Sequence, residues 1–130
     1  MKIGAILVTI ILTMAGNLYS QVMTGSKTSV TYTEKYGIKF IEISTLLKNN
    51  SSKTVAKVFI TVVFNDKRNN NPYDVTRPTK ADTDELDISI LPGWEKKAVF
   101  SVLQPSEVYW VYSYAKIERV IYSDGSVENL

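Results

Sequence analysis

The sequence predicts an all-β fold, an antiparallel sandwich of two sheets built from about seven strands. Apolar and polar residues alternate in several short runs, which is the period-two pattern of half-buried strands. Val, Ile, Thr and Tyr, which favour strands, are frequent, and no long window spaces its apolar residues as a helix would. Turn signals separate the runs at fairly regular intervals, as they do in small sandwiches.

The N-terminal residues 1–20 have the pattern of a secretory signal peptide. Lys2 supplies a positive charge, and residues 3–14 are almost entirely apolar. This run is about a dozen residues long, whereas a membrane-spanning helix needs roughly 20. We therefore expect cleavage after Ser20, export of a bacterial protein to the periplasm or the extracellular space, and a single sandwich domain at 21–130 with no membrane span.

Composition excludes several partner and cofactor classes. The chain has neither cysteine nor histidine, so disulfides, a lipid-modified cysteine and histidine-bearing metal sites are unavailable. Residues 1–20 contain one of the 15 basic residues and none of the 13 acidic ones, so the rest carries a formal charge of +1. Such a small net charge gives no sign of the basic patch that nucleic-acid binding requires, so we expect no nucleic-acid partner. We also expect no cofactor and no metal.

The first strand is expected around Val30 and Tyr32. The preceding residues 21–28 are small and polar, so we expect them to fray. A turn at Tyr36 and Gly37 then leads into the next strand.

The two longest strand-like runs, residues 38–48 and 54–65, are predicted to form a central hairpin closed by a polar loop. The apolar stripes of the two runs consist of Ile41, Ile43, Thr45 and Leu47, and of Val58, Ile60, Val62 and Phe64. Val55, Phe59 and Val63 add a second apolar face to residues 54–65. A strand covered on both faces is therefore expected there.

A polar stretch at residues 66–81 is predicted to be a long loop. Compact domains seldom keep a structureless connection of this length unless it is functional or disordered, and both alternatives stay open. Few apolar side chains are available to offset its ordering entropy, so residues 67–81 are expected to be the most mobile internal segment.

Two later turns are predicted from turn chemistry. Pro92 and Gly93 suit a type II turn, because proline presets one backbone angle and glycine accepts a positive φ. The strands on either side carry alternating apolar residues, namely Leu86, Ile88 and Ile90 before the turn and Ala98, Phe100 and Val102 after it. Asp124 and Gly125 form the second turn signal, which closes onto residues 127–130.

The apolar run at residues 108–122 is too long for one strand of a small domain, since it would extend roughly 50 Å. We therefore expect a break near Ser113. Beyond that break, Ile117 and Ile121 are predicted to face one way and Val120 and Tyr122 the other.

Several of these segments resemble FxLYD-like domains. The matching segments are Ile41-Glu42-Ile43, Leu47 with the following residues to Val55, Val62 with the following residues to Asp66, and Leu91-Pro92-Gly93. Asp66 matches the signature of the family outright, whereas Val62, Phe64 and Asn65 stand where it has Phe, Leu and Tyr. The resemblance implies an immunoglobulin-like sandwich in an exported bacterial module, and it brings no functional residues.

Four carboxylates in six residues, Asp82, Asp84, Glu85 and Asp87, are the main candidates for acid chemistry. The segment lacks the glycine and the distant glutamate of a calcium loop, so a solvated acidic edge is favoured over a metal site. A carboxylate-based hydrolase would need two of these acids on opposite sides of a cleft.

Four clustered rings, Tyr109, Trp110, Tyr112 and Tyr114, form the candidate binding face. Such rings suit flat stacking surfaces for sugars or peptides, although core packing is their more common role. The leading hypothesis is an exported, non-enzymatic binding, interaction or structural module with a protein or glycan partner. The alternatives are a carbohydrate-binding module that uses these rings and, third, the carboxylate-based hydrolase.

Overall fold

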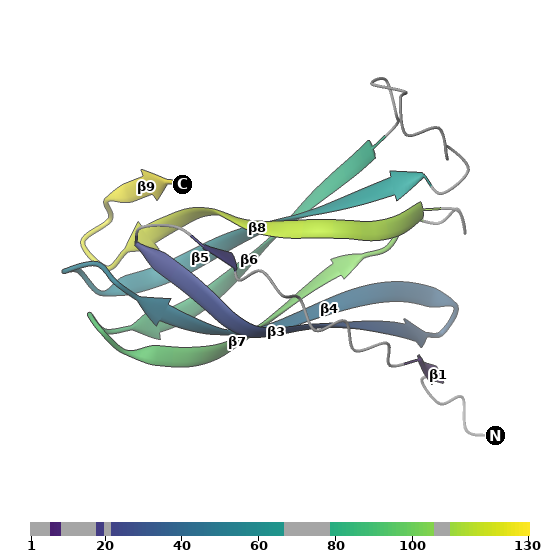
Figure 1. The fold of residues 1–130 in the computed structure, drawn as a ribbon, viewed down its shortest axis with the longest axis horizontal. Helices are drawn as coiled ribbons and strands as arrows, with labels where there is room; N and C mark the ends of the chain where they lie inside the picture. The colour runs from purple at the N-terminus through teal and green to yellow at the C-terminus, as the bar shows by residue number, and fades with distance from the viewer. Residues whose placement is uncertain (1–5, 9–17, 20–21, 67–78, 106–109) are drawn as a thin grey trace.

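The computed structural model describes residues 6–8, 18–19, 22–66, 79–105 and 110–130 (Figure 1). Every strand pair in this part of the chain is antiparallel. The strands are β1 (Ile6–Val8), β2 (Leu18–Tyr19), β3 (Met23–Lys35), β4 (Ile38–Asn49), β5 (Val55–Asp66), β6 (Thr79–Ile90), β7 (Glu95–Leu103), β8 (Trp110–Tyr122) and β9 (Val127–Asn129). No helix within these ranges is long and apolar enough to cross a membrane.

Two sheets form the layers seen in Figure 1. One has the order β3-β4-β7, and the short strands β1 and β2 pair with the other side of β3. The second has the order β6-β5-β8-β9. The predicted two-sheet antiparallel sandwich of about seven strands is therefore confirmed. Both β1 and β2 lie within residues 1–20, the predicted signal peptide.

The predicted hairpin of residues 38–48 with 54–65 is wrong. Strand β4 pairs with β3 and β7, whereas β5 pairs with β6 and β8. The polar loop between them crosses from one sheet to the other instead of closing a ladder. Its geometry is set by Asn49, whose backbone N–H donates to the Trp94 carbonyl at 3.0 Å in the turn that precedes β7.

The predicted core stripes are confirmed, because alternation reports which face of a strand is buried whatever strand lies beside it. Ile41, Ile43, Leu47, Val58, Ile60, Val62 and Phe64 are all fully buried. Thr45 is also buried in this stripe. Its hydroxyl forms hydrogen bonds with Thr28 Oγ1 at 3.0 Å and with the Ser26 carbonyl at 3.2 Å, so it is not left unpaired in the core.

The N-terminal part of the domain is more ordered than predicted. Residues from Met23 onward belong to β3, so the expected fraying of residues 21–28 is wrong for 23–28. The physical reason is twofold. Met23 is fully buried in the core, and its backbone pairs with Asn49 of β4.

The predicted loop at residues 66–81 is shorter than expected at both ends. Asp66 closes β5 and is buried, and β6 already begins at Thr79. The acidic stretch therefore lies within a strand that pairs with β5 over its whole length. Residues 67–78, on which the mobility prediction mainly falls, lie outside the described residues.

Strand β8 is continuous, so the predicted break near Ser113 is wrong. Instead, its pairing with β5 skips one residue at Ser113 and another at Glu118. Each skipped residue is a β-bulge, which shifts the alternation of the strand by one position. The core-facing side chains of β8 therefore do not follow a single every-second-residue pattern. They are those of Trp110, Ala115, Ile117, Val120 and Tyr122.

The second bulge also corrects the predicted facing of Ile117 and Ile121. Ile117 is buried in the core before the bulge, whereas Ile121 is only partly buried after it. The two side chains therefore do not share a face.

Both predicted glycine turns are confirmed. Gly93 has a φ of +78°, and the Trp94 N–H donates to the Leu91 carbonyl at 3.0 Å, as a type II turn requires. Gly125 has a φ of +85° and its N–H donates to the Tyr122 carbonyl at 3.0 Å.

Candidate functional site

Trp110 belongs to the core. Its side chain is 6% exposed and lies in one cluster with Val62 and Phe100. The Lys80 ammonium lies 4.9 Å from the centre of its ring and covers it from β6. A ring enclosed in this way cannot serve as a stacking surface for a ligand. Tyr109, the neighbouring member of the candidate binding face, lies outside the described residues.

The remaining two rings point to opposite sides of the sheet. Tyr112 is partly buried against the core, and burial raises its pKa to about 12, with a smaller contribution from Tyr32. Tyr114 is 47% exposed and lies on the outer face. The bulge at Ser113 separates them, so Trp110, Tyr112 and Tyr114 do not form one exposed plane.

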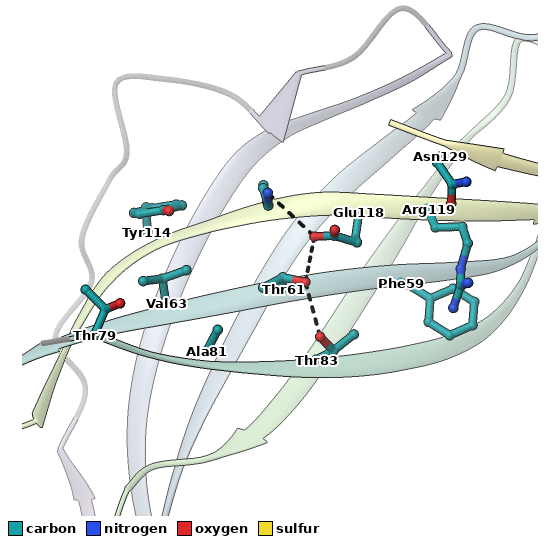
Figure 2. Close-up of a pocket in the computed structure, with 11 residues that line it drawn as sticks. Phe59, Thr61, Val63, Thr79, Ala81, Thr83, Tyr114, Glu118, Arg119 and Asn129 are labelled. Atoms are coloured by element: carbon teal, nitrogen blue, oxygen red, sulfur yellow. Dashed lines mark hydrogen bonds and ion pairs between the residues drawn. The ribbon is translucent and has the colours of Figure 1, made fainter.

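A groove of about 640 Å³ lies on the outer face of the sheet that contains β5, β6 and β8 (Figure 2). Tyr114 lies toward one end, and Phe59 and Arg119 lie toward the other. The groove is lined by Phe59, Thr61, Val63, Thr79, Ala81, Thr83, Tyr114, Lys116, Glu118, Arg119 and Asn129.

The pleat of β5 supplies the floor of the groove. Phe59, Thr61 and Val63 point outward because their neighbours along the strand fill the core. Strand β8 supplies one wall. The bulge at Glu118 allows both Glu118 and Arg119 to line the groove although they are adjacent in sequence.

A hydrogen-bond chain crosses the middle of the groove, as the dashed lines in Figure 2 show. The Thr61 hydroxyl donates to Glu118 Oε2 at 2.8 Å and accepts from the Thr83 hydroxyl at 3.2 Å. Lys116 Nζ lies 3.7 Å from the same Glu118 oxygen. Glu118 is thus held in place by a hydroxyl on one side and a cation on the other.

Arg119 is the charged residue of the groove that has no ionic partner within the described ranges. Its guanidinium carbon lies 4.3 Å from the centre of the Phe59 ring, a cation–π contact. Its Nε atom is buried and makes no hydrogen bond to any described residue. Sequence reasoning missed Arg119, because only the bulge before it brings its side chain to this face.

The four candidate carboxylates of β6 are divided between its two faces. Glu85 and Asp87 lie 3.9 and 3.4 Å from Lys57 Nζ on the outer side. Asp84 accepts a hydrogen bond from the Ser101 backbone N–H of β7 at 2.9 Å. Neighbours on one strand do not oppose each other across a cleft. Within the described part of the chain, no group of three or more acidic side chains is placed to hold a metal ion.

Comparison with known proteins found no match among family models, curated proteins or solved structures. The resemblance to FxLYD-like domains therefore stays a prediction. The candidate site follows from the geometry of the groove alone.

Proposed function

We propose that this chain is an exported, non-enzymatic binding module whose ligand lies in the groove over β6, β5 and β8. One observation carries the proposal. Two bulges on β8 gather Tyr114, Glu118 and Arg119 on a single outer face above an ordered floor. Bulges that redirect side chains are over-represented beside functional sites.

The residues of the groove support binding more than catalysis. The sequence contains no histidine and no cysteine, which removes the most common nucleophile and base pairs. The carboxylate of the groove, Glu118, is held by Thr61 and Lys116 instead of opposing a second acid. This arrangement gives the hydrolase hypothesis no support.

Export is part of the proposal and follows from the pattern of residues 1–20. We expect the protein recovered from the periplasm or the medium to begin at Gln21 or within a few residues of it. Intact-mass measurement of the exported protein tests this. A product that retains residues 1–20 would contradict signal-peptide cleavage.

Carbohydrate binding is the second candidate function, and the exposed ring of Tyr114 favours it. This ring is 47% exposed at one end of the groove, near the hydroxyl side chain of Thr79, and Thr83 lies farther along the groove. A flat apolar ring beside hydrogen-bonding groups suits a sugar. Trp110 and Tyr112 do not contribute, so this site differs from the flat aromatic platform expected from the sequence.

The groove can be tested by titrating the exported, isotope-labelled protein with soluble oligosaccharides and peptides while recording its amide NMR spectrum. A ligand of the groove should shift resonances of β5, β6 and β8, and Tyr114→Ala should weaken its binding. Trp94→Ala is a matched control, because Trp94 is 58% exposed in a turn and does not line the groove. Shifts confined to β3, β4 and β7 would contradict the proposal.

A further inference from the structure

We propose that Arg119 makes the groove selective for a carboxylate-bearing oligosaccharide. Its guanidinium binds the acid group of one sugar while another sugar of the same chain stacks on Tyr114. This inference depends on the proposed binding role of the groove, and it names the chemistry of the ligand.

Arg119 is prepared to receive an acidic group. Stacking on Phe59 at 4.3 Å holds the guanidinium in a fixed plane, and the Nε atom is shielded from water without a hydrogen-bond partner in the described residues. The planar fork of arginine matches a carboxylate in a bidentate manner, which favours an acid over a neutral acceptor.

The charges of the groove also favour one acidic group. Lys116 and Arg119 are its cations and Glu118 is its anion. Glu118 lies 3.7 Å from Lys116 Nζ, so these two charges offset each other. On the adjoining surface, Glu85 and Asp87 share the single cation Lys57, which leaves one negative charge there, but neither carboxylate forms an ion pair with Arg119 in the described part of the chain. The charge of Arg119 is therefore left for a ligand.

The spacing of the two recognition groups sets the size of the ligand. Tyr114 is level with Val63 of β5, and Arg119 is level with Phe59. These positions are four residues apart along β5, or about 13 Å at the usual rise per residue. That span exceeds a single sugar ring, so the ligand must contain several linked sugars, at least one of which is acidic.

The location of the groove favours a glycan over an extended peptide. Peptides that bind sheets usually add to an edge, where free backbone groups form a ladder with them. This groove lies on the face of β5, whose backbone already pairs with β6 and β8. It offers hydroxyls, an amide and a ring from side chains, which suit sugar hydroxyls and an apolar sugar face.

The test compares acidic oligosaccharides with neutral counterparts of the same length. Tri- and tetrasaccharides of galacturonate, of guluronate and of a glucuronate-containing repeat are titrated by calorimetry, alongside their carboxyl-reduced forms. At least one acidic probe should bind about tenfold more tightly than its reduced form or better, as expected for a charge-assisted hydrogen bond. Arg119→Gln should remove this preference, so that the variant binds an acidic probe and its reduced form equally, and Arg119→Lys should restore only part of the preference.

Lys96→Gln is the matched control, because it removes one exposed positive charge from β7 in the other sheet. It should leave affinity for every probe unchanged, and melting temperatures confirm that each variant is folded.

Three outcomes would contradict the inference at different levels. Equal binding of acidic and reduced probes, with no effect of Arg119→Gln, would overturn the role of Arg119. The groove would still be the binding site if Tyr114→Ala weakened binding. Tighter binding of an oligoglutamate peptide than of any uronate would overturn the glycan class. The absence of binding by every probe would overturn the inference, and groove resonances that respond to no ligand at all would overturn the proposed function too.

Discussion

The side-chain amide of Asn49 donates a hydrogen bond of 2.9 Å to the carbonyl oxygen of Ile90 and so joins the end of β4 to the end of β6 in the opposite sheet. The same Nδ2 atom donates to the Lys53 carbonyl at 2.7 Å, and Oδ1 accepts from the Ser51 backbone N–H at 2.9 Å. Asn49 is fully buried, and every polar group of its side chain is used. This residue fixes the crossover between the sheets.

We expect Asn49→Ala to lower the free energy of unfolding by about 2 to 4 kcal/mol, because it leaves the carbonyl oxygens of Ile90 and Lys53 without their donor. Asn49→Asp should cost at least as much, since a buried carboxylate would then face two carbonyl oxygens. Chemical denaturation of the purified variants measures both changes.

Asn50→Ala provides the control for this effect. The Asn50 amide donates to Thr24 Oγ1 at 2.8 Å, but the contact is exposed to solvent. Its loss should therefore change the unfolding free energy by less than about 1 kcal/mol. Equal losses at positions 49 and 50 would show that burial of Asn49 does not set its contribution.

The two ends of the aromatic cluster should respond differently to truncation. Trp110→Ala is expected to cost about 3 to 5 kcal/mol of unfolding free energy, because this ring fills the core beside Val62 and Phe100. Tyr114→Ala removes a half-exposed ring and should cost less than about 1 kcal/mol. Thermal and chemical denaturation distinguish the two. A Trp110→Ala protein that melts within a few degrees of the parent would show that the ring does not support the core.

The faces of the strands could be predicted from the sequence, but their partners could not. Burial of one face imposes a period of two on residues such as Ile41 and Val58 whichever strand lies alongside. Neighbouring runs therefore predict a hairpin as readily as a crossover. The contacts that decide between them join Asn49 to Ile90 and Trp94, which lie more than forty positions away.

The candidate site was predicted only in part for a similar reason. Tyr114 was identified from its aromatic neighbours, whereas Arg119 was missed. A single extra residue in a strand transfers every later side chain to the other face. The bulges at Ser113 and Glu118 depend on how β8 pairs with β5, and no turn residue marks either one.

The turn between β8 and β9 should resist acid, because Asp124 titrates at an unusually low pH. Hydrogen bonds from the Ser126 side chain and backbone, followed by the contact with Lys53, lower the pKa of Asp124 to about 2. The contribution of this carboxylate to stability should be complete above its ordinary pKa of about 4 and lost as the pH falls through about 2. Carboxyl carbon shifts measured by NMR against pH report the titration.

Two variants separate the causes of that low pKa. Ser126→Ala removes the largest contribution and should raise the pKa of Asp124 toward its ordinary value. Lys53→Gln removes an exposed ammonium that lies 3.2 Å from Asp124 Oδ2 and should raise the pKa less. A larger effect of Lys53→Gln would show that charge, and not the turn hydrogen bonds, controls this group.

Tyr112 should make the fold sensitive to strong alkali. Burial, together with the neighbouring Tyr32, raises the pKa of the Tyr112 phenol to about 12. Above pH ~10 the unfolded chain loses the Tyr112 proton while the folded chain keeps it. The free energy of unfolding should therefore fall as the pH rises from about 10 to about 12. Below that range, Tyr112 should not affect it. Ultraviolet absorbance of tyrosinate, measured against pH, should show a titration step near pH 12 that Tyr112→Phe removes. The unfolding free energy of this variant should also decline less steeply between about pH 10 and about pH 12. If the titration step persists unchanged in Tyr112→Phe, another tyrosine produces it and the placement of Tyr112 against the core is wrong.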